Sequence, residues 1–199
     1  MAYKTIMADP PWPYHSSDLK AAPLHRPNTW DGPTGGVAAK ERYGLMTLAD
    51  IAALPVRDMA DANAHLYLWT TNSFMVEAHE VMRSWGFEPK TIVTWVKHKA
   101  GEPTMPSMKM GYWFRSASEH CIFGVRGKLR LKDKVCLPTW FAHERMAHSA
   151  KPEVFRAMVE KASPGPYLEM FARKATPGWD VWGNQAPSSI ELPVGIKED

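Results

Sequence analysis

The residues with the clearest chemical potential are Asp9-Pro10-Pro11-Trp12, which follow a short apolar segment near the start of the chain. The two prolines stiffen the turn, because each fixes its φ angle and lacks an N–H group. The Asp9 carboxylate and the Pro10 carbonyl could then accept both hydrogens of a planar NH₂ group, while Trp12 or Tyr14 stacks on its ring. Acceptors in fixed positions favour the pyramidal, nucleophilic form of an adenine amine as positive charge develops on it. The motif therefore predicts chemistry at the exocyclic amine of adenine.

The same four residues also have a structural interpretation, in which the aspartate starts a polyproline turn and Trp12 anchors that turn in the core. Asp-Pro-Pro alone does not decide between the two interpretations. The complete tetrapeptide, placed directly after a predicted strand, favours the chemical one. An adenine inside a duplex cannot reach such a site, so the target base would be single-stranded or flipped out of the helix.

The elements that must position this motif can be predicted from the apolar pattern. Helices are predicted over 73–85 and 152–162, where apolar residues recur at helical spacing. Strands that alternate with helices indicate an α/β fold with helices on both faces of the sheet, and ligands in such folds bind beyond the carboxyl ends of the strands. Short runs of β-branched and aromatic residues predict strands at 4–8, 64–70, 91–96, 119–125, 167–171 and 179–182.

Two segments rich in proline and glycine, about 13–43 and 97–113, are predicted to be loops. Structureless stretches of this length in a small domain are usually functional, so both are expected to close over a site. A chain of 199 residues is expected to form one domain, covering 1–199.

The composition is that of a globular protein, with 45% hydrophobic and 23% charged residues, which excludes a disordered chain or a fibre. No apolar run approaches the roughly 20 residues that span a bilayer, and the first residues do not form a signal peptide. Two cysteines do not make a disulfide scaffold. We therefore expect a soluble, cytoplasmic protein, and its net charge of +3 permits nucleic acid as a partner without requiring it.

A row of basic residues offers a second candidate for binding. If this segment is extended, its even-numbered positions share one face, which would suit a phosphate backbone. The alternative is a solvated edge strand, where lysines discourage aggregation. The row consists of Arg126, Lys128, Arg130, Lys132 and Lys134.

Two other kinds of site are not supported. Ser149 follows His148 without the surrounding residues of a nucleophile elbow, which argues against a hydrolase. Cys121 lies in an apolar strand pattern and is predicted to be core. We predict no metal site, because no zinc-type spacing occurs among His120, Cys121, Cys136, His143 and His148.

Several motifs, taken in order, resemble the MT-A70 family of S-adenosylmethionine-dependent adenine N6-methyltransferases, and bacterial or phage members in particular. The resemblance runs from about Tyr3 to Gln185. Besides the catalytic Asp9-Pro10-Pro11-Trp12, the matching segments are Tyr43-Gly44-Leu45-Met46, Leu66-Tyr67-Leu68-Trp69-Thr70, Trp95-Val96-Lys97, Glu119-His120-Cys121, His148-Ser149-Ala150-Lys151-Pro152, Leu168-Glu169-Met170-Phe171 and Trp182-Gly183-Asn184-Gln185.

The resemblance implies a Rossmann-like class I methyltransferase sheet in which the order of motifs is permuted, as in beta-class enzymes. The catalytic motif comes early, and much of the S-adenosylmethionine site comes late. Asp9 and Pro10 would hold the target amine, Trp12 would stack on the base, and Tyr43 would lie near it. The cofactor contacts implied are Asp9, Ser118, Glu169, Arg173, Asn184 and Gln185.

From the motif and the resemblance together, we predict an adenine N6-methyltransferase that acts on DNA. The predicted substrate-binding residues are Tyr14, Tyr43, Lys128, Arg130 and Lys132, and a homodimer is possible. RNA is the alternative substrate. A non-catalytic nucleic-acid-binding subunit and a methyltransferase acting on free nucleotides or protein amines are alternatives from other classes.

Overall fold

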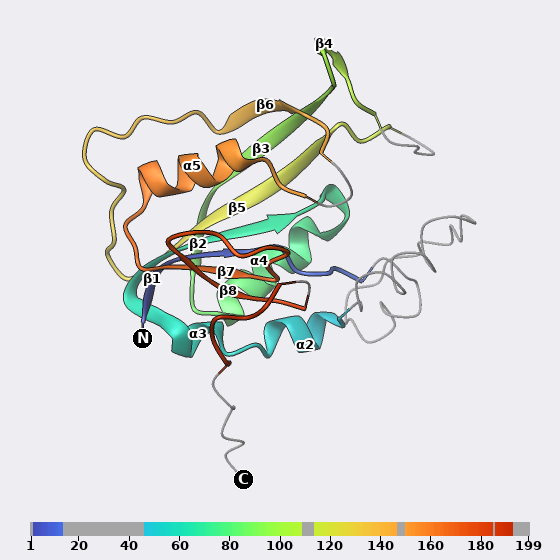
Figure 1. Cartoon of the computed structure of the whole chain (residues 1–199). Helices are drawn as coiled ribbons and strands as arrows, with labels where there is room; N and C mark the ends of the chain where they lie inside the picture. The colour runs from blue at the N-terminus through green and yellow to red at the C-terminus, as the bar shows by residue number, and fades with distance from the viewer. Residues whose placement is uncertain (1, 14–45, 109–113, 147–149, 185, 193–199) are drawn as a thin grey trace.

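The computed structural model describes residues 2–13, 46–108, 114–146, 150–184 and 186–192. Within them the strands form one mixed sheet in the order β4-β3-β5-β2-β1-β7-β8, with β6 paired to β3 (Figure 1). The strands are β1 (Tyr3–Ala8), β2 (Ala60–Thr70), β3 (Glu88–Lys99), β4 (Glu102–Pro106), β5 (Ser118–Arg126), β6 (Trp140–Glu144), β7 (Tyr167–Met170) and β8 (Trp179–Trp182).

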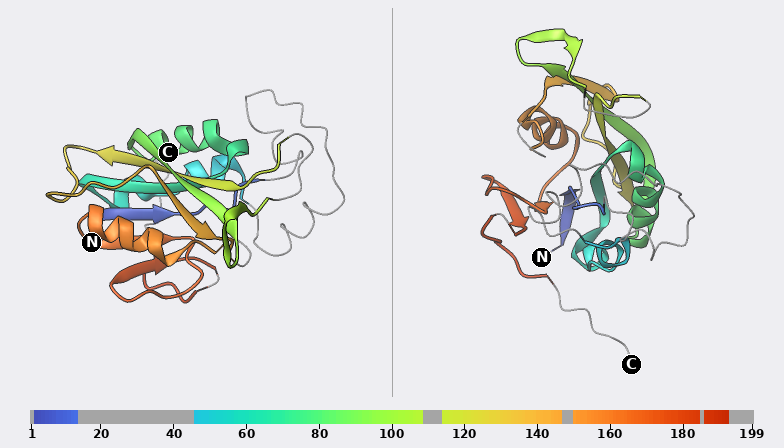
Figure 2. Two further views of the ribbon diagram at one scale, coloured as in Figure 1. Left: turned by 90° about the horizontal axis from the view of Figure 1, so that it is seen from above. Right: turned by 90° about the vertical axis from the view of Figure 1, so that its right-hand side faces the viewer.

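The helices cover both faces of this sheet (Figure 2). Ile6 and Ala8 of β1 belong to the same apolar cluster as residues of α2 and α4, whereas Met7 belongs to a second cluster with Phe155 and Val159 of α5. Alternate residues of one strand therefore enter different cores. The predicted α/β class with helices on both faces is confirmed. The helices are α2 (Leu48–Ala52), α3 (Val56–Met59), the 3₁₀ turn η2 (Asn72–Phe74), α4 (Met75–Ser84) and α5 (Glu153–Ala162). None of the helices in the described ranges has the length and apolarity needed to cross a membrane.

Strand β1 lies inside the sheet and pairs in parallel with β2 on one side and with β7 on the other. Strand β8 is parallel to β7, whereas β5 runs antiparallel to β2. The carboxyl ends of β1, β2, β7 and β8 therefore meet along one side of the sheet, where the strands end, together with the first residues of β5. We call this the Asp9 edge, because Asp9 directly follows β1.

The predicted strands and helices occur where the apolar pattern placed them, but part of one predicted loop forms strands instead. Residues 97–106 belong largely to the end of β3 and to β4, which pair as a hairpin. Every residue of β4 is exposed, so the segment lacks the apolar alternation that would have revealed a strand. Most of the other predicted loop, 13–43, lies outside the described residues.

A buried polar network lies away from the Asp9 edge and connects β2 to two loops. His65 is fully buried in β2; its Nδ1 is 2.8 Å from the Ser163 hydroxyl and its Nε2 is 3.2 Å from the Leu129 carbonyl. The Tyr67 hydroxyl lies 2.7 Å from the same Ser163 oxygen. Because the Leu129 carbonyl can only accept, Nε2 carries the proton, Ser163 donates to Nδ1, and Tyr67 donates to Ser163. A neutral His65 thus satisfies all these groups and holds the chain after β5 against the sheet.

This network makes the stability of the protein depend on pH. Burial lowers the pKa of His65, although its hydrogen bond to Leu129 opposes the shift. The unfolded chain therefore binds a proton at His65 near pH 6.5, whereas the folded protein binds it only at lower pH. The free energy of unfolding should fall as the pH decreases from about 6.5 toward the pKa of the folded state.

Urea unfolding between about pH 8 and pH 5 would measure this effect in the wild type and in His65→Gln, whose amide does not titrate. The wild type should lose more stability across the window than the variant does, whatever their difference at pH 8. Parallel pH profiles would contradict the assignment to His65.

Candidate active site

The Asp9 edge carries a chain of alternating charges that comes from four separate segments. Lys151, just before α5, donates from Nζ to Asp9 Oδ2 at 2.5 Å. The same Nζ is 3.4 Å from Oε2 of Glu119, near the start of β5. The other carboxylate oxygen of Glu119 accepts from Nζ of Lys97, near the end of β3. Residues far apart in the sequence thus form one continuous cluster, which we call the charge chain: Asp9, Lys151, Glu119 and Lys97.

The charge chain is shielded from solvent and lies against aromatic rings. The side chains of Lys97, Glu119 and Lys151 are only 6%, 12% and 16% exposed. Lys97 Nζ is 4.4 Å from the ring centre of Trp95, and Lys151 Nζ is 5.2 Å from that of Trp69. Attraction to the ring face stabilises each ammonium where water is largely excluded.

Electrostatics keep Lys151 charged in this setting. Burial by itself would lower the pKa of Lys151, but the nearby carboxylates of Asp9 and Glu119 outweigh burial and raise it above its ordinary value. Lys151 is therefore a cation throughout the neutral range and makes a charge-assisted hydrogen bond to Asp9. Sequence reasoning did not assign a role to Lys151 or Glu119, and it considered Lys97 only as a possible addition to the basic row. All three nevertheless lie in motifs that match the family: His148-Ser149-Ala150-Lys151-Pro152, Glu119-His120-Cys121 and Trp95-Val96-Lys97.

The structure places the side chain of Trp12 in the core. It stacks on Phe74 with ring centres 5.8 Å apart, and its Nε1 donates to the Trp69 carbonyl at 3.0 Å. Both the ring and the N–H group of Trp12 are thus engaged within the protein, as in the structural interpretation of the motif. In this arrangement Trp12 anchors the turn after Asp9, and its stacking on a target base stays a prediction.

Pro10 has the position predicted for it, but its carbonyl is already in use. That oxygen accepts the backbone N–H of Trp12 at 2.9 Å, which closes a tight turn directly after Asp9. A carbonyl has two lone pairs, so one acceptor position remains. Pro11 contributes to the same turn, since its carbonyl accepts from the N–H of Met46 at 3.4 Å.

A second set of ion pairs lies beside Asp9 at the end of β7. Glu169 pairs with Met7 of β1 in the sheet, and its Oε2 accepts from Arg156 Nη2 at 2.5 Å. Arg156 also donates to Glu153, which in turn accepts from Lys174. Burial raises the pKa of Glu169, against the opposing effect of Arg156. These contacts tie the start of α5 to the loop after β7.

The remaining predicted cofactor residues gather at the same edge. Arg173 follows β7 and lies close enough to Lys151 to influence its titration. Asn184 is exposed two residues after β8, and Ser118 begins β5 next to Glu119. A methyl group on Gly183 would lie 2.3 Å from the Ala172 carbonyl oxygen, so the loop after β7 crosses the end of β8 without room for a side chain. Backbone, amide, carboxylate and cationic groups thus line one continuous edge.

The basic row predicted to bind substrate lies elsewhere. Arg126 pairs with Ala64 near the start of β2, so the row lies at the edge opposite to Asp9. Beyond Arg126 the chain is not a strand. It turns at Gly127, and Lys134 has a positive φ of 61°. The prediction of five side chains on one extended face is therefore wrong, because glycine and a left-handed residue break the alternation.

The members of this row have separate partners. Lys132 donates from Nζ to the Glu160 carbonyl at 2.6 Å and from its backbone N–H to the Ala162 carbonyl at 2.9 Å, so it caps the end of α5. Lys128 and Arg130 are exposed. Three further predicted site residues, Tyr14, Tyr43 and Gln185, lie outside the described residues.

Neither cysteine contributes to this site. Cys121 is buried in the core, as predicted, whereas Cys136 is exposed. Burial raises the pKa of the Cys121 thiol. Across the residues that the structure describes, no three His, Cys, Asp or Glu side chains are grouped to hold a metal ion.

Comparison with known proteins gives one family and several relatives. The MT-A70 family model matches residues 3–185. The N(6)-adenosine-methyltransferase catalytic subunit METTL3 of Homo sapiens is 27% identical over 186 residues, which are 92% of this chain but 28% of that protein. The N(6)-adenosine-methyltransferase MT-A70-like of Arabidopsis thaliana is 27% identical over 198 residues and is covered over 25% of its length. The type II methyltransferase M.MunI of Mycoplasma sp is 28% identical over 201 residues and is covered over 82% of its length.

A double-mutant cycle would measure how strongly Asp9 and Lys151 are coupled. Either Asp9→Asn or Lys151→Met alone leaves a largely buried charge without its partner, so each should lower the free energy of unfolding. The double variant should lose less than the sum of the two, by about 1 to 3 kcal/mol. Chemical denaturation of the four proteins gives the coupling.

A matched control cycle is available in the exposed pair Lys174 and Glu153, whose side chains are 66% and 57% exposed. Its coupling should be about 0.5 kcal/mol or less, since water screens the charges. Equal coupling in the two cycles would show that the charge chain is no stronger than a surface ion pair.

Proposed function

This chain belongs to the MT-A70 family, and from that premise we propose that it is an S-adenosylmethionine-dependent methyltransferase acting on the N6 amine of adenine in DNA. One observation carries the proposal: Asp9 of the family motif lies at the carboxyl end of an interior parallel strand, with its carboxylate held by Lys151. Ligands of open α/β sheets bind at this edge. The described strands form one sheet, which supports a single methyltransferase domain with a permuted order of motifs.

The residues at the Asp9 edge have the chemistry needed for S-adenosylmethionine. Asn184 supplies an amide and Glu169 a carboxylate that can accept hydrogen bonds from ribose hydroxyls. Lys151 and Arg173 supply cations for the carboxylate of the methionine part, and Asp9 supplies a negative charge near the positive sulfur. Ser118 adds a hydroxyl at the start of β5. The tight crossing at Gly183 brings backbone groups of both loops to the same place. The fit is therefore good.

The protein residues would act mainly by orientation and electrostatics. Asp9 accepts one hydrogen of the adenine amine, and the remaining lone pair of the Pro10 carbonyl accepts the other. This geometry directs the nitrogen lone pair toward the donor and stabilises the positive charge that grows on it. S-adenosylmethionine would supply the methyl group, which is bound to a positively charged sulfur. The rest of the molecule then leaves as a neutral thioether. A carbon–nitrogen bond forms as the carbon–sulfur bond breaks, and the proton released by the amine passes to Asp9 or to water.

Lys151 would hold the Asp9 carboxylate in the orientation that this reaction needs. Its ammonium is fixed between two carboxylates and above the Trp69 ring, so its position is set from three sides. The Asp9 carboxylate is thereby restricted to a narrow range of orientations before any substrate arrives. Preorganisation of this kind reduces the rearrangement needed in the transition state. Because Trp12 is engaged in the core, Tyr14 and Tyr43 remain proposed as further rings for stacking on the base.

The choice of DNA rests on the size of the relatives. The chain covers 82% of the type II methyltransferase M.MunI but only 28% of METTL3. It therefore matches the compact bacterial relative almost end to end, whereas it spans less than a third of the adenosine-methyltransferase subunit. RNA stays the second candidate, because the names of several relatives specify adenosine as the target.

The proposal can be tested by offering labelled S-adenosylmethionine with single-stranded DNA, duplex DNA and RNA, followed by mass spectrometry of the nucleosides. N6-methyladenine should form in a DNA sample. Asp9→Asn should lower the rate by about a hundredfold to a thousandfold, because removing a group that stabilises transition-state charge has effects of this size. The exposed Asp58→Asn serves as a control with the same change in charge and should keep full activity.

Product in the RNA sample alone would overturn the choice of DNA and retain the reaction. Full activity of Asp9→Asn would remove Asp9 from catalysis. A folded protein that binds S-adenosylmethionine but methylates nothing would favour a role as part of a larger complex, whereas failure to bind it would favour a non-catalytic nucleic-acid-binding subunit.

Asn184 provides a separate test of the cofactor site. Asn184→Ala should weaken the binding of S-adenosylmethionine about tenfold, because an amide that bonds the ligand contributes roughly 1 to 1.5 kcal/mol. Binding of nucleic acid should change little. Calorimetry measures the first affinity and fluorescence anisotropy the second. Glu80→Ala, at an exposed position of α4, is a suitable control. An unchanged cofactor affinity would exclude Asn184 from the site.

A further inference from the structure

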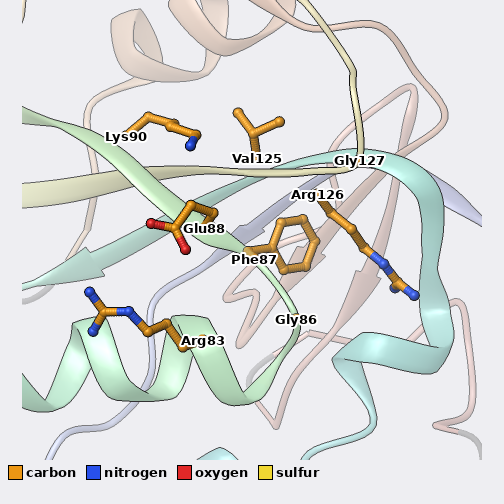
Figure 3. A pocket seen from close by; sticks show the side chains of 8 residues that line it. All are labelled: Arg83, Gly86, Phe87, Glu88, Lys90, Val125, Arg126 and Gly127. Atoms are coloured by element: carbon orange, nitrogen blue, oxygen red, sulfur yellow. The ribbon is translucent and has the colours of Figure 1, made fainter.

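A pocket of about 430 Å³ opens at the edge of the sheet opposite to Asp9, where α4 ends, β3 begins and β5 ends (Figure 3). Its volume lies within the range of small-ligand sites. Four charged side chains line it: Arg83 from α4, Glu88 and Lys90 from β3, and Arg126 from β5. Three cations thus surround one carboxylate, which leaves an excess of positive charge around a concave surface.

The cations differ in how they are held. Arg126 donates from Nη1 to the carbonyls of Arg57 and Ala60, at 2.5 and 3.3 Å, so its guanidinium is fixed against the turn that enters β2. Arg83 and Lys90 are exposed, and neither makes an ion pair or a side-chain hydrogen bond with any other described residue. The pocket therefore combines one positioned guanidinium with two cations that have no partner among the residues the structure describes.

The backbone around the pocket is also fixed. Gly86 has a φ of 83°, and the N–H groups of Gly86 and Phe87 donate to the carbonyls of Arg83 and Met82, which closes the end of α4. Phe87 is 2% exposed and anchors the turn in the core. Arg83 and Lys90 thus project from a rigid turn and a strand end, so the spacing between their backbones does not depend on a flexible loop.

Positive charge focused in a concavity attracts anions, and guanidinium groups match phosphate oxygens well. Resting on the function proposed above, we propose that this pocket binds backbone phosphates of the nucleic-acid substrate, at a distance from the base that is methylated. We call it the distal phosphate site. Glu88 would restrict how deeply a phosphate enters, and Lys128, which is exposed one residue beyond Gly127, extends the same positive surface.

The fold sets the spacing between the two sites. Strand β5 runs from Glu119, in the charge chain, to Arg126, in the pocket. These seven steps of about 3.3 Å amount to roughly 23 Å. Duplex DNA rises 3.4 Å for each base pair, so a polymer must extend about seven base pairs beyond the target adenine to reach the distal phosphate site. Short substrates would therefore be bound without it.

This difference in length provides the test. The double variant Arg83→Gln/Lys90→Gln removes two exposed charges and leaves Arg126 and its hydrogen bonds intact. The matched control, Lys4→Gln/Lys161→Gln, removes two exposed charges elsewhere in the described chain. Each protein is measured for anisotropy and for methylation with a duplex of about 24 base pairs and with a duplex of about 8 base pairs that has the target adenine at its centre.

The double variant should bind the long duplex about tenfold more weakly, and the slope of log affinity against log salt should become shallower by about 1 to 2. Its KM for the long duplex should rise with little change in kcat, and methylation of the short duplex should stay at the wild-type level. The control variant should behave like the wild type on both substrates.

Unchanged affinity of the double variant for the long duplex would overturn the distal phosphate site. So would equal losses on the short and long substrates, or an equal loss in the control variant, because either result would indicate a general effect of charge. Pyrophosphate binding is measured by calorimetry as well. If the double variant loses it but binds the long duplex normally, the distal phosphate site is overturned and the pocket is assigned to a small phosphate ligand. If the wild type itself neither binds nor methylates nucleic acid, the function proposed above fails first, and the two failures are thereby distinguished.

Discussion

The contact between Asp9 and Lys151 is the interaction on which the arrangement of the proposed active site depends. It joins the end of the first strand to the segment that enters α5, across most of the length of the chain. The pair can form only because β1 lies inside a parallel part of the sheet, so that its carboxyl end meets those of β2 and β7. Glu119 then fixes Lys151 from the antiparallel strand β5. The segment before α5, strand β5 and, through the Trp69 ring, strand β2 therefore contribute to the position of a single carboxylate.

Aromatic residues support this cluster from both sides of the sheet. Trp69 and Trp95 pack edge to face below the two lysines, with ring centres 6.4 Å apart, and Phe155 of α5 packs on Trp69 at 4.6 Å. On the opposite face, Trp12 and Phe74 close the turn after Asp9. Large rings exclude water, and a drier setting strengthens the attraction between charges. Trp12, Trp69 and Trp95 thus have a structural role that does not require contact with a base.

The sequence allowed six of the strands and the two long helices to be predicted, because their apolar residues follow a regular period. Strands β4 and β6 were not predicted, because their residues are largely exposed and leave no such period. Asp9 could be assigned from its motif, but the burial of Trp12 could not, since a tryptophan after a strand suits both a core and a ligand site. The charge chain could not be predicted for another reason. Its members are brought together by the topology of the sheet, and no local pattern specifies which lysine contacts which carboxylate.

Gly183 has a consequence for comparing proteins of this kind. Any side chain there would have to enter the space already occupied by the backbone of Ala172, whose carbonyl oxygen would lie 2.3 Å from the added carbon. A relative with a larger residue at this position would have to separate the loop after β7 from the end of β8, even if its aspartate, prolines and tryptophan were all intact. The identity of this one small residue can therefore serve as a diagnostic marker. It separates chains in which the loop after β7 packs on the end of β8 from those that retain only the motif.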